Sequence, residues 1–305
     1  MDQYQLPSAR IGRVHLQVSH LDRALVFYSE MLGFYPTQSE RGFAKLSASK
    51  TGVSLILLTE NSKAHPKPPR TTGLYHVAIR LPDREALGSI LRHLVENRAP
   101  LRGFADHKVS EAIYLNDPDG NGIELYTDRP RSEWPWANQQ VQMTSDPLDV
   151  QSLLAAARDD SPSWDGIHPG TDIGHVHLQV SDLARAERFY HDVLGFDVTQ
   201  RTYPGALFLS AGGYHHHIGL NIWASSSAPP PPGDAVGLLS FEIVVPTMKV
   251  IQTLTTRIQL SDIPFESIEM EADRRGFRVQ DQDGITVDIC SPQAEILRSS
   301  QQITT

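Results

Sequence analysis

The chain has 305 residues, and its 27 Lys and Arg against 36 Asp and Glu give a formal net charge of −9. This length suits two domains of roughly 130 to 150 residues, and the charge, which lacks long blocks of one sign, argues against nucleic-acid or membrane partners. No signal peptide or run of about 18 apolar residues is present, and Cys290 is the only cysteine, so we expect a cytoplasmic protein without disulfides or thiolate metal sites.

The stretch from Gly12 to Phe34 is repeated from Gly174 to Phe196, with 15 identical residues among 23 aligned positions. Each copy begins with the alternation of a strand. The first copy continues with Ser19 as a helix N-cap and apolar residues at helical spacing, and it stops at Gly33. The chain is therefore an internal duplication.

In chain order, each half predicts two units of strand, helix and further strands. The first unit spans 11–60, with a strand and helix and then strands at 42–47 and 52–59; the second has a strand at 74–81, a helix at 84–97 and strands at 111–115 and 122–127. The third spans 174–223, and the fourth has a strand at 238–245, a helix at about 248–259 and a strand at 285–290.

We therefore expect an α+β fold with two domains. Each domain would consist of paired βαβββ modules that form a curled, mostly antiparallel sheet around a central cavity. The expected boundaries are a first domain at 1–127, which holds the metal site described next, a linker at 128–172, a second domain at 173–292 and a C-terminal tail at 293–305.

His15, His76 and Glu124 occupy strands that converge if the first two units pair. Two imidazoles and one carboxylate on three strands would form a facial triad with open coordination positions, as in non-heme Fe(II) oxygenases. Each residue alone also has an ordinary interpretation: a strand histidine is often a buried hydrogen-bonding group, and the glutamate could be a surface carboxylate.

The repeated motif H-L-Q-V-S-x-L-x-R-A-x-x-F-Y-x-x-x-L-G-F resembles the vicinal oxygen chelate superfamily (glyoxalases, bleomycin resistance proteins and extradiol dioxygenases) over nearly the whole chain. The stretch from His107 to Glu124, with its His, Tyr, acidic-Pro turn and final Glu, is similar to the extradiol dioxygenase signature; it departs at Ala105, where that family has other residues. The resemblance, which is strongest to two-domain catechol 2,3-dioxygenases, implies that Glu124 binds iron and that His107 and Tyr114 line the site and handle protons.

The second half offers a weaker metal site. His177 repeats His15, but Ser240 stands where His76 would be, and Asp288 replaces the glutamate. A run of histidines includes His217, so His177, His217 and Asp288 remain candidates for a second site. Domain interface and pocket lining are the other interpretations of that run.

The resemblance implies Fe(II), with Mn(II) as the alternative, and an aromatic diol and dioxygen as small-molecule partners. A homodimer is our default expectation. Two other functions stay open: a glyoxalase-like metal-dependent lyase or isomerase, and a metal-free small-molecule binding protein of the drug-resistance type. The absence of a carboxylate in the middle of the strand at 52–59 favours three metal ligands over four.

Overall fold

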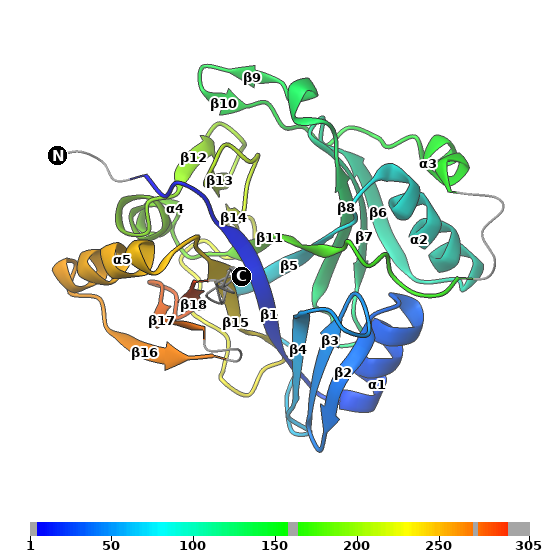
Figure 1. Cartoon of the computed structure of the whole chain (residues 1–305), viewed down its shortest axis with the longest axis horizontal. Coiled ribbons are helices and arrows are strands. Elements are labelled where there is room, and N and C mark those ends of the chain that lie inside the picture. The colour runs from blue at the N-terminus through cyan, green and yellow to red at the C-terminus, as the bar shows by residue number, and fades with distance from the viewer. Residues whose placement is uncertain (1–4, 158–163, 271–273, 292–305) are drawn as a thin grey trace, which may run out of the picture.

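The computed structural model describes residues 5–157, 164–270 and 274–291. Four units of strand, helix and three strands follow one another along this part of the chain, and the helices lie at the periphery (Figure 1). The expected tail at 293–305 and residues 158–163 of the expected linker lie outside the described residues.

The first unit consists of β1 (Arg10–Val18), α1 (Leu21–Leu25), β2 (Tyr35–Glu40), β3 (Phe43–Ser47) and β4 (Ser54–Glu60). α1 continues as a π-helical turn, Val26–Met31, and the helical segment ends before Gly33, whose φ of +82° is a conformation that only glycine adopts readily. His20 is the N-cap, one residue later than expected, because the Ser19 hydroxyl donates a hydrogen bond to Asp119 instead.

The second unit consists of β5 (Gly73–Arg80), α2 (Arg84–Glu96), β6 (Leu101–Asp106), β7 (Ser110–Asn116) and β8 (Gly122–Asp128). The Asp83 carboxylate caps α2 by accepting a hydrogen bond from the Ala86 amide at 2.8 Å. The apolar face expected for this helix, including Leu87 and Leu91, is fully buried.

The connection between the halves is irregular, as expected. It holds a 3-10 turn (Arg131–Glu133), a small hairpin of β9 (Trp136–Ala137) and β10 (Gln140–Val141), and α3 (Val150–Ala156). α3 packs on α2 at Gly88, where a Cβ would stand 2.5 Å from the Leu153 carbonyl oxygen. This helix of the connection is therefore packed against the rest of the molecule.

The third unit consists of β11 (Asp172–Gln179), α4 (Leu183–Glu187) with a π-helical turn (Arg188–Val193), β12 (Asp197–Gln200), β13 (Ala206–Ser210) and β14 (Ile218–Asn221). The fourth consists of β15 (Gly237–Val244), α5 (Met248–Leu260), β16 (Phe265–Glu269), β17 (Arg275–Gln280) and β18 (Thr286–Cys290). The expected helix and last strand of the fourth unit are confirmed.

The strands form two curled, mostly antiparallel sheets of eight strands each, besides the small hairpin. The first sheet has the order β16-β17-β18-β15-β1-β4-β3-β2, and the second has the order β12-β13-β14-β11-β5-β8-β7-β6. The expected α+β class with paired βαβββ modules is confirmed. The expected partners are wrong: the first unit pairs with the fourth, and the second pairs with the third.

This exchange of partners means that each half of the sequence contributes one unit to each sheet. The two units of each half are nevertheless joined by hydrogen bonds. The hydroxyl of Tyr28, from the first unit, donates to Asp117 of the second at 3.1 Å, and Tyr190 of the third unit donates to Asp281 of the fourth at 3.0 Å. The buried tyrosines thus join the two sheets within each half.

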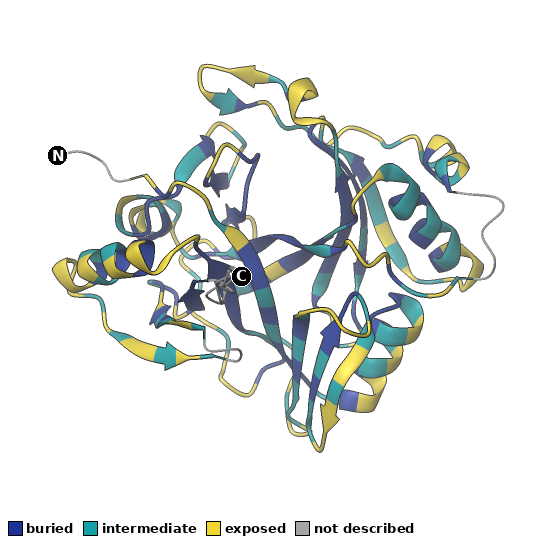
Figure 2. Cartoon of the chain, viewed as in Figure 1, coloured by how far each residue is buried: buried dark blue, intermediate teal, exposed yellow. Residues whose placement is uncertain are grey.

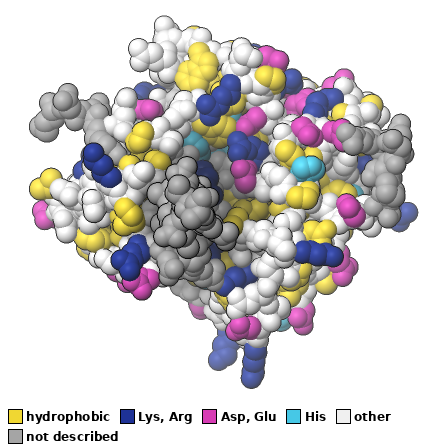
Figure 3. Space-filling view, in the orientation of Figure 1, with side chains coloured by type: hydrophobic (Ala, Val, Ile, Leu, Met, Phe, Trp, Pro, Cys, Tyr) yellow, Lys and Arg dark blue, Asp and Glu magenta, His cyan; other side chains and the backbone are white. Residues whose placement is uncertain are grey.

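Buried residues concentrate on the strands and on the inner helix faces, while exposed residues lie on the outer helix faces and loops (Figure 2). Basic and acidic side chains are interspersed over the face shown in Figure 3, without a large patch of one sign. Among the described residues, no helix is long and apolar enough to cross a membrane.

Candidate functional site

Three side chains from three strands of the second sheet meet on one face: His76 of β5, Glu124 of β8 and His175 of β11. In the sheet register, Glu124 and His175 lie beside Ala78 from opposite sides, and His76 is two residues before that alanine. Residues two apart on a strand share a face, as do cross-strand partners. The pairing of the second unit with the third therefore brings the three side chains together.

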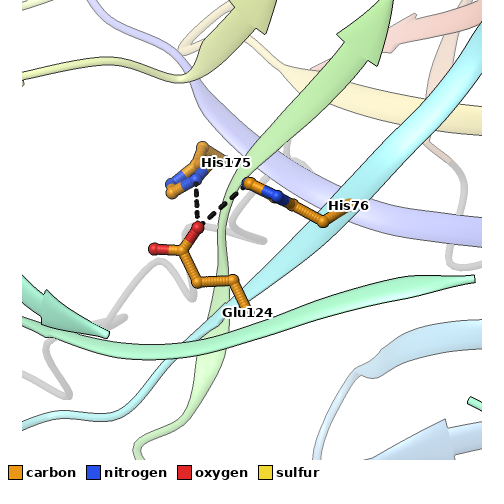
Figure 4. A group of neighbouring side chains, drawn as sticks. All are labelled: His76, Glu124 and His175. Atoms are coloured by element: carbon orange, nitrogen blue, oxygen red, sulfur yellow. Dashed lines mark ion pairs between the residues drawn. The ribbon is translucent and has the colours of Figure 1, made fainter. Parts of the chain in front are cut away.

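The group is tight and buried. Glu124 Oε2 lies 2.9 Å from His76 Nε2 and 3.4 Å from His175 Nε2, and one donor atom from each residue lies within 4.8 Å of the others (Figure 4). Their side chains are buried, and His76 Nε2 makes no hydrogen bond to any described residue. One carboxylate and two imidazoles in this arrangement can hold a divalent cation that accepts oxygen and nitrogen donors.

The charge states also suit a cation. Burial opposes ionisation of Glu124, but His175 and His76 outweigh burial and hold the pKa of this carboxyl well below its usual range. Burial lowers the pKa of His175 to about 4, against the opposing pull of Glu124. At neutral pH the carboxyl is thus an anion and His175 is neutral, which is the form in which imidazole binds metals.

Two glycines allow the strands to approach this closely. A Cβ at Gly122, which pairs with His76, would stand 2.1 Å from the Tyr75 carbonyl oxygen. A Cβ at Gly174, beside His175, would stand 1.7 Å from the Tyr126 hydroxyl oxygen. A side chain at position 122 would therefore displace β5, which carries His76, and one at position 174 would displace the buried Tyr126 ring.

His15 does not belong to this group, so the expected triad requires correction. It lies on β1 in the first sheet, pairs with Ser240, and places Nε2 2.8 Å from Thr59 Oγ1. His175 stands in the position where we had expected His15. The cause is that β1 and β11 carry the same strand pattern, and alternation alone does not indicate which of them joins β5.

The sequence contains a signal that identifies His175. His76 and His175 each stand seven residues before the aspartate that caps the next helix, Asp83 and Asp182. His177, which we had singled out in this strand, stands two residues later. A count back from each helix cap would therefore have found the correct histidine.

In the first sheet, the positions equivalent to these three hold Arg13, Ser240 and Asp288. Arg13 and Ser240 also stand seven residues before helix N-caps, and Asp288 occupies the register position on β18 that Glu124 occupies on β8. Asp288 accepts two hydrogen bonds from Arg278, at 2.6 and 2.9 Å, while Arg13 Nε lies 3.0 Å from Glu242 Oε2. In the first sheet, arginines therefore form ion pairs with the carboxylates that could otherwise have bound a cation.

The candidates for a second metal site do not converge. Asp288 lies in the first sheet, whereas His177 lies in the second, with its ring centroid 4.9 Å from that of His76. His217 precedes β14, and its Nδ1 lies 3.1 Å from Ser210 Oγ. Among the described residues, the group of His76, Glu124 and His175 is the one cluster of three such donors.

His107 and Tyr114 lie beside this group, as expected. Tyr114 pairs with Glu124 across β7 and β8, and its hydroxyl lies 2.7 Å from His107 Nε2. His107 Nδ1 lies 2.5 Å from the Thr144 carbonyl oxygen. A carbonyl only accepts, so Nδ1 carries the hydrogen, and Nε2 is the ring nitrogen that can accept from Tyr114. Burial and the Glu124 charge raise the pKa of Tyr114 well above its usual value, so its hydroxyl stays protonated.

The histidine run forms a second chain of hydrogen bonds, and its His216 lines the cavity described below, which agrees with the interpretation of the run as pocket lining. Asp128 Oδ1 lies 2.8 Å from His215 Nε2, and His215 Nδ1 lies 2.7 Å from His216 Nδ1. Burial lowers the pKa of both histidines, so both rings are neutral at neutral pH. The carboxylate fixes hydrogen on His215 Nε2, His216 donates to His215 through Nδ1, and His216 Nε2 is left as a free base.

These groups open onto a cavity of about 350 Å³. Aromatic and apolar side chains form most of its wall, namely Tyr75, Phe104, Val109, Met143, Tyr203, Phe208 and Trp223. His107, His175 and His216 line it together with Glu124. An apolar wall with a few convergent polar groups is typical of a site for a small ring-shaped ligand.

Comparison with known proteins identifies the repeated units. The model of the glyoxalase/bleomycin resistance protein/dioxygenase superfamily matches the chain twice, at residues 10–125 and 172–289. A catechol-2,3-dioxygenase of Bacillus subtilis (strain 168) is 45% identical over 275 residues, which is 89% of this chain and 93% of that protein.

Solved structures share the architecture. A Bacillus subtilis protein provisionally assigned as a dioxygenase aligns with a TM-score of 0.66 and 11% identity, over 94% of this chain and 86% of that one. Glyoxalase I of Zea mays aligns with a TM-score of 0.56 and 16% identity, over 93% of this chain and 92% of that one. At these identities the likeness concerns the fold alone.

Proposed function

Because the chain belongs to the glyoxalase/bleomycin resistance protein/dioxygenase superfamily and is an extradiol dioxygenase, we propose that it cleaves the ring of a catechol-type diol with dioxygen. We propose that His76, Glu124 and His175 hold one Fe(II) ion for this reaction, with Mn(II) as the alternative. The single observation that carries the proposal is the buried cluster of these three donors on the wall of an aromatic cavity.

The three residues fit such an ion. His76 Nε2 lies 2.9 Å from a carboxylate oxygen, yet it makes no hydrogen bond to any described residue. A buried nitrogen that makes no hydrogen bond is costly, and a cation bound by both the nitrogen and the carboxylate would satisfy both groups. Three protein ligands would leave coordination positions open, where an ion of this kind supplies a chelation site for two diol oxygens and for dioxygen.

His107 and His216 are the bases that can take the protons of the diol. His216 Nε2 is a free base on the cavity wall, and His107 Nε2 can receive a proton through the Tyr114 hydroxyl. Each ring is oriented through its other nitrogen, by His215 or by the Thr144 carbonyl. A neutral imidazole near neutral pH is suited to accept a proton and later to return it.

The rest of the cavity positions the ring. Tyr75 and Trp223 lie with centroids 5.4 Å apart, and the Trp223 indole donates to the Pro204 carbonyl oxygen at 2.8 Å, which fixes its orientation. An aromatic substrate that packs against these two side chains would gain both burial and ring contacts. The same wall would keep water from the reacting atoms.

The test starts from protein purified without oxygen. We expect about one Fe(II) per chain, and a coloured ring-cleavage product together with oxygen uptake once catechol and air are added. Removal of the ion by a chelator should abolish both, and added Fe(II) should restore them. Tight catechol binding without turnover at full metal content would contradict the proposal, as would turnover only of hemithioacetals, the glyoxalase-type substrates.

A further inference from the structure

A second cavity adjoins the first. It has a volume of about 660 Å³, and four residues line both cavities, namely Tyr75, His76, Arg102 and Tyr114. Since His76 is a proposed metal ligand, the second cavity begins next to the proposed centre. A group on a molecule bound at the centre can therefore reach into it.

The second cavity is cationic. Lys67, Arg70 and Arg102 line it, and its one acidic lining residue among those described is Asp119. The Asp119 carboxylate is already paired with Arg23 at 2.5 Å and accepts further hydrogen bonds from Ser19. The one carboxylate among the described lining residues is thus already paired with Arg23, and the three cations of the wall share no other acidic lining residue.

Lys67 is the most confined of these cations. Its Nζ lies 2.5 Å from Gln179 Oε1 and 3.2 Å from the Leu74 carbonyl oxygen, so its described partners are uncharged. Burial lowers the pKa of this lysine to about 8, and it remains mainly charged at neutral pH. A partly buried charge without a counterion is unfavourable, and an incoming anion would relieve that cost.

The local sequence holds Lys67 in place. Pro66 precedes it and Pro68 and Pro69 follow it, which restricts the backbone on both sides. The first sheet shows that the glutamine does not need a cation. Gln17, the counterpart of Gln179 in the repeat, donates directly to the Ala235 carbonyl oxygen at 2.7 Å. The contact of a lysine with this glutamine is therefore found beside the second sheet, at Gln179, and not at Gln17 of the first.

We propose that this cationic cavity binds an organic carboxylate next to the metal centre. The inference rests on the proposed function, which supplies two sources of that group. In ring cleavage, both atoms of dioxygen enter the product, the bond beside the diol breaks, and one new carboxyl group forms that loses its proton at neutral pH. The other source is a carboxylate substituent on the catechol itself.

The direct test measures equilibrium binding to the iron-loaded enzyme. The probe is sorbate, a linear six-carbon carboxylate, and 2,4-hexadien-1-ol is its uncharged counterpart. We expect Lys67→Met to weaken sorbate binding roughly 10- to 100-fold, the scale of a hydrogen bond to a charged group, without affecting the alcohol. Lys67→Arg, which keeps the charge, should retain most of the affinity. Lys63→Met removes an exposed lysine from the same loop and serves as the matched control.

Kinetics separates the two sources. If the product carboxylate is bound, Lys67→Met raises the inhibition constant of the product of unsubstituted catechol and leaves substrate KM unchanged. If a substrate carboxylate is bound, it raises KM for 3,4-dihydroxyphenylacetate but not for catechol. Equal sorbate affinity in wild type and Lys67→Met, or an equal loss in Lys63→Met, would overturn the inference. Failure of the wild type to cleave any catechol would instead overturn the proposed function, because sorbate binding is measured without turnover.

Discussion

Replacing His175 or His15 by alanine distinguishes the ligand set that we propose from the structure from the set expected from the sequence. Both histidines lie on the first strand of a repeated unit, but only His175 has its Nε2 within 3.4 Å of Glu124. His15 instead contacts Thr59 and the edge of Phe43 in the other sheet. We expect His175→Ala to lose the metal and His15→Ala to keep it.

The size of both effects follows from these contacts. Metal sites in small peptides bind with roughly 10 to 16 kcal/mol over four ligands, so one ligand contributes roughly 3 to 4 kcal/mol. Loss of His175 should therefore weaken metal binding by a factor of about 100 to 1000. Loss of His15 removes one hydrogen bond and one aromatic contact, which lowers the free energy of unfolding by about 1 to 2 kcal/mol.

The assay compares metal content after dialysis against a graded chelator with thermal unfolding of the same preparations. Wild type should carry one equivalent per chain, and His15→Ala should match it while unfolding at a lower temperature. Retention of one tightly bound equivalent in His175→Ala, combined with its loss in His15→Ala, would refute the assignment. Two equivalents in the wild type would refute the view that only the second sheet binds metal.

Three further predictions follow from the same geometry. Glu124→Gln keeps the side-chain volume but removes the anion, so we expect loss of metal and activity with the fold retained, measured by metal analysis and circular dichroism. His107→Ala should keep the metal and slow turnover by roughly 10²- to 10⁴-fold; His216→Ala should behave alike, and kcat at full metal content checks both. Burial raises the pKa of Asp281 to about 6, so the native state holds this proton more tightly than the unfolded chain does. This tighter proton binding adds about 3 kcal/mol to the free energy of unfolding in acid, and the contribution is lost as pH rises from about 4 through 6. Asp281→Asn, which can still bond Tyr190, should remove that dependence in denaturant titrations at pH 4 and 7; an unchanged dependence would contradict it.

The units of the fold could be predicted because their signals are local. About a dozen neighbouring residues are enough to predict each of three features: the apolar face of α2, the end of the first helix before Gly33, and each of the duplicated strands. The partner of each unit is not local information. Gly12 of β1 lies so close to Glu242 of the fourth unit that a Cβ would stand 2.2 Å from its carboxylate oxygen. Close packing between strands more than 200 residues apart in the sequence produces no periodic pattern of residues from which the pairing could be predicted.

The same limit explains the error in the site. His76 and Glu124 belong to one unit, and their positions on its first and last strands sufficed to join them. The third donor comes from another unit, and we chose His15 because a histidine is present at that position in both copies of the repeat. In a duplicated protein, a functional residue of one copy need not be present at the equivalent position of the other copy. The informative position was that of Arg13 and His175, where the two copies of the repeat differ.

That difference explains why the described residues of a duplicated chain hold one cluster of three possible metal donors. Where the second sheet has His175, the first has Arg13, whose Nε lies 3.0 Å from Glu242 Oε2. Asp288 is held by Arg278 in the same way. An arginine stays protonated at any pH at which the protein is folded, so it would repel a cation while neutralising the acids left behind. In the first sheet, ion pairs thus stabilise the strands at the place where the second sheet gathers metal donors.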